Sequence, residues 1–209
     1  MYKEPFEGAY AEKQPKKILI LGESHHDIRP EKTTKMVMAE YLAGAGSNTF
    51  QKIARAFGVD RKCARDEERA LLWDKVFFGN YIDMSLDGPS GEEDRTAEKL
   101  IAANKDCCNQ ELAEFIQVHE IDVVFCFSVK VFDALPNQEG HWSRTLFQDV
   151  RHGKADLWFG RGYRPDSPFG REIKVYGAPH PRYWNYVGIT PEELAQYTRP
   201  IFEECCRVL

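Results

Sequence analysis

The sequence predicts an α/β protein, a three-layer α/β/α sandwich around a mainly parallel sheet of about four strands. Four short runs rich in apolar, β-branched or aromatic residues predict the strands, at 17–22, 75–82, 122–127 and 173–178. Long stretches with helical character separate these runs, and strands that alternate with helices are typical of parallel βαβ units. The first run is apolar at four consecutive positions, as expected for a strand that helices cover on both faces.

The helices are predicted from apolar spacing and from the residues at their ends. Residues 48–57 carry apolar side chains at positions 50, 53, 54 and 57, the spacing of one helix face, and Gly58 ends the pattern. A second helical region runs from about 96 to 119, with an interruption expected near 107–109. The final helix is predicted to begin after Thr190 as its N-cap, with Pro191 at its first position.

Three further segments complete the predicted order of elements. Ser128 directly follows the third strand, where the N-cap of a helix is expected. Residues 83–95 are polar and contain Gly, Pro and Ser, so we expect a loop there. Residues 155–160 are expected to form a short strand at an edge of the sheet.

The size and composition predict a single domain over residues 1–209, with a full-sized core. The hydrophobic fraction of 43% and the charged fraction of 29% are ordinary for a soluble protein. No apolar run approaches the roughly 20 residues that span a bilayer, and the first residues lack the apolar core of a signal peptide. We therefore expect a cytoplasmic monomer that has no membrane partner.

The six cysteines do not have the spacing of a zinc site or of a disulfide framework. They stand at 63, 107, 108, 126, 205 and 206, so none forms a C-x-x-C pair and four lie in two adjacent pairs. The sequence therefore predicts reduced thiols with mainly structural roles.

The net charge of −5 does not favour tight, non-specific binding to nucleic acid, which depends on phosphate neutralisation. The segment 151–186 differs from the rest, because it holds seven basic residues, three acidic residues and eight aromatic residues. Basic and aromatic side chains together suit a nucleic-acid groove, where phosphates pair and bases stack. The alternative is a long surface segment whose aromatic side chains anchor it to the core.

Polar and titratable side chains follow the predicted strands. The first strand is followed by Gly22, which permits a sharp turn, and then by Glu23, Ser24, His25, His26 and Asp27. Asn80 lies near the end of the second strand, Ser128 follows the third, and the segment 179–186 follows the fourth. Because the carboxyl ends of parallel strands meet at one edge of a sheet, we expect these groups to form a ligand site there.

These motifs, in this order over nearly the whole chain, resemble the uracil-DNA glycosylase superfamily. Its members share a Gly-acidic or Gly-polar loop after the first strand, an Asn that reads the base and a late His-Pro-Ser-type loop. The loop at 22–26, Asn80 and the segment 180–182 match these three features. The segment 47–53 is similar to the stretch that opens a helix at the DNA backbone in that superfamily.

The resemblance implies hydrolysis of the N-glycosidic bond of a deaminated or damaged base, such as uracil, in DNA. Base removal requires an amide and an aromatic ring to hold the extruded base, a donor for the leaving base, and a group that positions water. Asn80 and Phe50 are then expected to bind the base, and His180 to stabilise the negative charge on it. Glu23, or one of the histidines at 25 and 26, would position the water.

The match has departures. Familiar members carry Asp at the position of Ser24, where it orients the attacking water, and Pro at the position of His25. Arg182 stands where a Ser is usual, and Tyr183 and Trp184 follow it where a smaller side chain would enter the duplex. Together with Ser128, the residues at 182–184 are the expected DNA contacts. The cysteine pattern of the iron–sulfur members is missing, so we expect no iron–sulfur cluster and no other cofactor.

Two other functions fit the same residues. One is a non-catalytic module that binds nucleotides or nucleic acid on the same fold, an alternative motivated by the missing Asp. The other is a metal-dependent hydrolase that uses Glu23, Asp27 and the two histidines, although adjacent residues rarely ligate one ion together.

Overall fold

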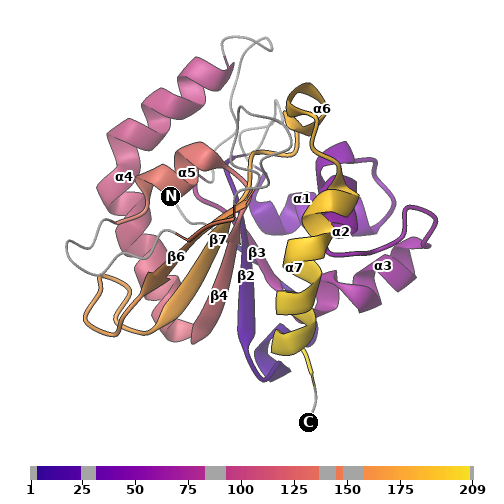
Figure 1. Cartoon of the computed structure of the whole chain (residues 1–209), viewed down its shortest axis with the longest axis horizontal. Helices are drawn as coiled ribbons and strands as arrows, with labels where there is room; N and C mark the ends of the chain where they lie inside the picture. The colour runs from indigo at the N-terminus through magenta and orange to yellow at the C-terminus, as the bar shows by residue number, and fades with distance from the viewer. Residues whose placement is uncertain (1–3, 25–31, 83–92, 137–144, 148–157, 208–209) are drawn as a thin grey trace.

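The computed structural model describes residues 4–24, 32–82, 93–136, 145–147 and 158–207 (Figure 1). Within these residues seven strands form one sheet, in the order β1-β3-β2-β4-β7-β6-β5. The strands are β1 (Phe6–Glu7), β2 (Lys17–Gly22), β3 (Phe77–Asn80), β4 (Ile121–Cys126), β5 (Thr145–Phe147), β6 (Trp158–Tyr163) and β7 (Ile173–Gly177).

The centre of the sheet consists of the four predicted strands. β3, β2, β4 and β7 are neighbours, and each adjacent pair among them is parallel. The α/β class is therefore confirmed, but the sheet is larger and more mixed than the expected four mainly parallel strands. β1 pairs with β3 in the antiparallel sense, and β6 and β5 extend the other side with two further antiparallel pairings.

The predicted edge strand at 155–160 differs from the structure in two ways. The strand begins later, at Trp158, and β5 pairs along its outer side, so that β6 is not at the edge of the sheet. Residues 155–157 lie outside the described part of the chain, as do most of the residues of the predicted loop at 83–95.

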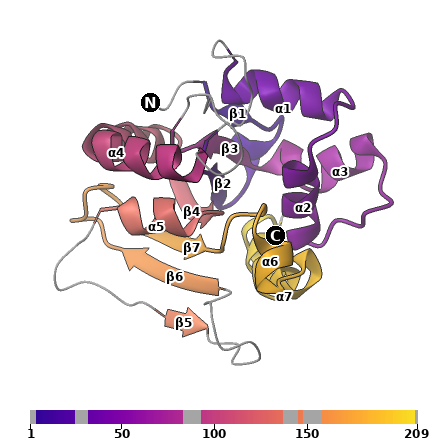
Figure 2. The same ribbon diagram turned by 90° about the horizontal axis from the view of Figure 1, so that it is seen from above.

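Helices cover both faces of the sheet, as the view from above shows (Figure 2). α4 (Glu93–Val118) and α5 (Val129–Ala134) lie on one face, and α2 (Asn48–Ala56), α3 (Arg65–Leu71) and α7 (Pro191–Cys205) lie on the other. The remaining helices are α1 (Thr34–Leu42), α6 (Trp184–Val187) and the 3₁₀ turns η1 (Ala11–Lys13) and η2 (Trp73–Lys75). Among the described residues, no helix is long and apolar enough to cross a membrane.

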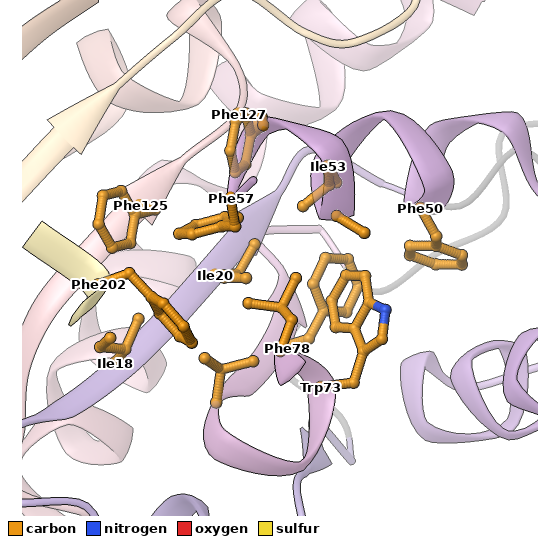
Figure 3. Packing of buried hydrophobic residues seen from close by; sticks show 14 of the residues in the cluster. Ile18, Ile20, Phe50, Ile53, Phe57, Trp73, Phe78, Phe125, Phe127 and Phe202 are labelled. Atoms are coloured by element: carbon orange, nitrogen blue, oxygen red, sulfur yellow. The ribbon is translucent and has the colours of Figure 1, made fainter. Parts of the chain in front are cut away.

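Strand β2 separates two hydrophobic layers. Ile18 and Ile20 pack into the layer beneath α2 and α7, whereas Leu19 and Leu21 pack into the layer beneath α4 and α5. All four side chains are fully buried, which explains the uninterrupted apolar run, because both faces of the strand are covered. Burying a side chain of this size contributes about 1.5–3 kcal/mol. Figure 3 shows the first layer, in which aromatic rings fill the space between the sheet and the helices.

The helix ends follow their expected signals. Thr190 caps α7 by accepting a hydrogen bond from the Glu193 amide, and the Glu193 carboxylate accepts one from the Thr190 amide. Helix α4 continues through 107–109, so the expected interruption there is wrong. Cys108 packs into the core, and the Asn109 side chain bonds the Tyr81 hydroxyl and the Ala134 carbonyl instead of competing for its own helix backbone.

Candidate functional site

A cavity of about 380 Å³ lies at the carboxyl ends of β2 and β3. Its walls come from the ends of these strands, from α1 and α2, and from the loop that follows β7. Polar residues from separate parts of the chain line it, among them Glu23, Lys32, Asn80 and His180. The volume is at the lower end of the range of about 300–1,000 Å³ for small-molecule sites. It suits a ligand of modest size.

Backbone hydrogen bonds to residues 81 and 82 continue past the end of β2 into the turn that follows it. The Gly22 carbonyl accepts a hydrogen bond from the Tyr81 amide, and the Glu23 carbonyl accepts one from the Ile82 amide, both at 3.0 Å. The side chain of Glu23 is buried, and its Oε2 accepts a hydrogen bond of 2.6 Å from the Ser128 hydroxyl. The Glu23 carboxylate is thereby placed in the cavity wall by bonds on its backbone and on its side chain.

Asn80 is the last residue of β3 and lies beside Gly22 in the parallel pair. Its side chain covers the α-carbon of Gly22 so closely that a β-carbon at position 22 would collide with Asn80 Oδ1. Asn80 Nδ2 donates a hydrogen bond to Thr34 Oγ1 at 3.4 Å. The buried amide therefore sits at the cavity wall, where it can offer both a donor and an acceptor to a ligand.

His180 lies between two prolines in the loop after β7, and this loop is anchored on both sides of the histidine. The Trp184 indole donates a hydrogen bond to the Pro179 carbonyl at 2.7 Å, and Lys52 Nζ of α2 donates one to the Pro181 carbonyl at 2.9 Å. His180 Nδ1 accepts the Arg182 amide at 3.2 Å. A ring nitrogen that accepts is unprotonated, so a neutral His180 carries its proton on Nε2.

Phe50 forms an aromatic wall of the cavity. Its ring packs against Tyr41 at 5.0 Å and Phe78 at 5.2 Å between ring centroids, and Trp73 lies behind them. The Tyr41 hydroxyl and the Trp73 indole both donate hydrogen bonds to one buried carboxylate, Glu68. An aromatic ring fixed in this way offers a rigid surface on which a planar ligand can stack.

The sequence did not predict three of the charged residues in and behind this wall. Lys32 lines the cavity with an almost fully buried side chain and pairs with Glu40, whose carboxylate is half exposed. Glu68 lies behind the aromatic wall and also accepts a hydrogen bond from Arg65 at 3.0 Å. No motif surrounds these residues, and their roles follow from packing that brings α1 to the cavity and α3 behind its aromatic wall.

The predicted DNA contacts occupy different positions in the structure. Ser128 is 1% exposed and Trp184 is fully buried against Phe127, so neither side chain can reach a nucleic acid. Trp184 packs there because its indole N–H finds a buried acceptor in the loop after β7. Arg182 and Tyr183 are half-buried beside His180. His25, the remaining predicted residue of the first loop, lies outside the described residues, as do His26 and Asp27.

Tyr186 is an exposed aromatic residue, and no pattern in the sequence distinguishes it from its aromatic neighbours. It lies in α6, six positions after His180, and 85% of its surface is exposed. The burial of Trp184 by the same short helix leaves Tyr186 on the outer side. An aromatic side chain held in solvent offers an open face on which a planar ligand can stack.

The basic and aromatic residues of 151–186 do not form one groove in the described part of that segment. Arg161 is buried, with its guanidinium over the Phe132 ring at 4.3 Å. Arg171 pairs with Asp122 near the amino ends of the parallel strands, far from the cavity. Tyr163 and Phe169 are core residues. Tyr163 and Phe169 therefore anchor the described part of this segment to the core.

The described residues contain no group of three or more His, Cys, Asp or Glu side chains arranged to hold a metal ion. All six cysteines are free thiols, and burial raises the pKa of the Cys126 thiol to about 12. The chemical groups of the cavity include a carboxylate, an amide, an imidazole and an aromatic face.

No protein-family model and no curated protein matches the sequence.

Proposed function

We propose that this protein hydrolyses the N-glycosidic bond of a deaminated or damaged base in DNA, in the manner of the uracil-DNA glycosylase superfamily that its motifs resemble. The observation that carries the proposal is the meeting of four residues in one cavity: Glu23, Phe50, Asn80 and His180. These residues come from four distant parts of the chain, and together they supply the groups that base removal needs.

Each residue has a role that its surroundings support. The base stacks on Phe50 and pairs with the Asn80 amide. Water, held by the Glu23 carboxylate, attacks the sugar C1′ as the bond from C1′ to the base nitrogen breaks. The departing base takes the bonding electrons, and the Nε2–H of His180 stabilises that negative charge. The water leaves its hydroxyl on C1′ of the abasic sugar, and its other proton neutralises the released base.

The direct test is a panel of oligonucleotides that contain uracil, hypoxanthine or xanthine, in single-stranded and double-stranded form. We expect the wild-type protein to produce abasic sites on at least one of them. His180→Ala and Asn80→Ala should lower the rate by about 100-fold or more, because each removes a group that acts on the reacting base.

A matched histidine control is available in His119→Ala. His119 bonds Glu12 at the end of α4, away from the cavity, so its loss should leave the rate unchanged. If no oligonucleotide of the panel is cleaved, or if His119→Ala and His180→Ala lose the same activity, the glycosylase assignment is wrong.

Ser24 supports a second candidate, a module that binds nucleotides or nucleic acid without turnover. It stands where related enzymes carry the water-orienting Asp, and within the described residues its buried hydroxyl has no hydrogen-bond partner. Binding of a base-containing oligonucleotide that weakens with added salt, with no abasic product, would favour this function. Ser24→Asp would then be the variant in which to look for gained hydrolysis.

A further inference from the structure

Ser128 occupies a position between Glu23 and helix α5. Its hydroxyl donates a hydrogen bond to Glu23 Oε2 at 2.6 Å and accepts one from the Val131 amide at 3.3 Å. The residue is 1% exposed and does not line the cavity, so it lies behind the carboxylate, on the side away from a ligand. Because the Val131 amide and the Glu23 carboxylate are a donor and an acceptor, the hydroxyl accepts from the first and gives its single proton to the second.

This arrangement determines what Glu23 presents to the cavity. Ser128 engages Oε2, so Oε1 is the oxygen that remains for a ligand or a water. A hydrogen bond to a carboxylate is short and strong, so it fixes the orientation of the group. The α5 backbone in turn fixes the hydroxyl, because the Val131 amide is part of the first turn of that helix.

We propose that Ser128 is a positioning residue for the hydrolysis, which acts through Glu23 and not through contact with DNA. The inference rests on the proposed glycosylase function. It means that α5, through Ser128, orients the Glu23 carboxylate that holds the water. A plain helix cap would need only the bond from Val131. The 2.6 Å bond to a buried carboxylate from a different strand is the additional observation that a cap does not require.

The test compares Ser128→Ala with Glu23→Ala and with the double variant, using whichever oligonucleotide the wild-type protein cleaves. We expect Ser128→Ala to lower kcat by about 10- to 100-fold with little change in KM, because a hydrogen bond to a charged group is lost. In the double variant, kcat should equal that of Glu23→Ala, because Ser128 then has no carboxylate left to orient.

Thr190→Ala is the control for a merely structural effect. Thr190 also caps a helix with its side chain, but that helix is α7 and the residue is outside the cavity. We expect it to lower the melting temperature about as much as Ser128→Ala while kcat stays at the wild-type value.

Three results would overturn the inference. A Ser128→Ala variant with wild-type kcat would show that the bond to Glu23 does not matter for the reaction. A double variant much slower than Glu23→Ala would show that Ser128 acts independently of Glu23. An inactive wild-type protein would remove the glycosylase proposal itself, and the inference with it, and that outcome is recognised before any variant is compared.

Discussion

Asn80 and Gly22 lie opposite one another on two parallel strands, and the Asn80 amide fills the space that a side chain at position 22 would need. The Asn80 side chain and the turn that begins the first loop are thus in direct contact. A larger residue at position 22 would have to displace the Asn80 amide.

Replacing Gly22 with Ala is expected to displace the Asn80 amide and to lower kcat/KM by on the order of 100-fold, as a shift of about 1 Å in a positioned group does. The measurement is steady-state base release on the preferred oligonucleotide. Gly162→Ala is the matched control, because a β-carbon at position 162 meets no atom within 4 Å. Unchanged kinetics in Gly22→Ala would mean that Asn80 does not read the base.

Lys52 connects helix α2 to the loop of His180 through its bond to the Pro181 carbonyl. We expect Lys52→Ala to lower kcat by on the order of tenfold, because the loop would no longer hold the imidazole in one place. Arg55→Ala, on the same helix, removes an ion pair with Glu192 and should leave kcat unchanged. Equal losses in both variants would point to a general effect on α2.

Tyr186 is expected to contribute to DNA binding without contacting the reacting base. Tyr186→Ala should raise the Kd for an oligonucleotide by about 5- to 150-fold, which corresponds to the ~1–3 kcal/mol that stacking on one base contributes. Tyr10→Ala removes an exposed tyrosine near the N-terminus and serves as the comparison in the same fluorescence titration. Identical Kd values for the two variants would exclude a stacking role for Tyr186.

Glu68 stabilises the aromatic wall through hydrogen bonds from Tyr41, Trp73 and Arg65. Glu68→Gln turns one acceptor oxygen into a donor, so either the shared acceptor of Tyr41 and Trp73 or the acceptor of Arg65 is lost. We expect a loss of about 1–3 kcal/mol in the free energy of unfolding, measured by urea denaturation. The neighbouring exposed acid provides the control: Asp66→Asn should unfold at nearly the wild-type urea concentration.

The pH dependence of stability should include a contribution from Glu12. Its hydrogen bonds from Lys17 and then from His119 hold the pKa of this carboxyl below its ordinary value of 4.5. A lowered pKa in the folded protein stabilises it above the unfolded value, and this contribution is lost as the pH falls through the folded value. The wild-type protein should therefore lose its stability advantage over Glu12→Gln below pH ~4.5. Thermal unfolding of both proteins at a series of pH values measures this difference. A constant difference between the two proteins across that range would contradict the assignment.

The central fold could be predicted because its signals are local. The run ending at Gly22 is apolar at consecutive positions, which predicts a strand buried on both faces. Thr190 followed by Pro191 predicts the start of a helix. The outer strands could not be predicted in this way. Strand β1 has two residues, and β5 has three, so neither is long enough to show a pattern of alternation.

The candidate site was partly predictable for a related reason. Parallel strands bring their carboxyl ends together, so Glu23 and Asn80 were expected to meet. The burial of Trp184 was not predictable, because it depends on how the loop after β7 packs against Phe127. The burial of Ser128 depends on its contact with Glu23, which is 105 positions earlier in the chain. Long-range packing of this kind leaves no periodic pattern in the sequence.

Phe50 belongs both to the cavity wall and to the hydrophobic layer between the sheet and its helices (Figure 3). A substitution that enlarges the cavity at this position would also open a void in the core, at a cost of about 3–5 kcal/mol for Phe→Ala. The shape of the cavity can change at lower cost around Ala45 and Gly46, where the chain between α1 and α2 borders it and is exposed. That segment is where a library designed to alter base preference would best be concentrated.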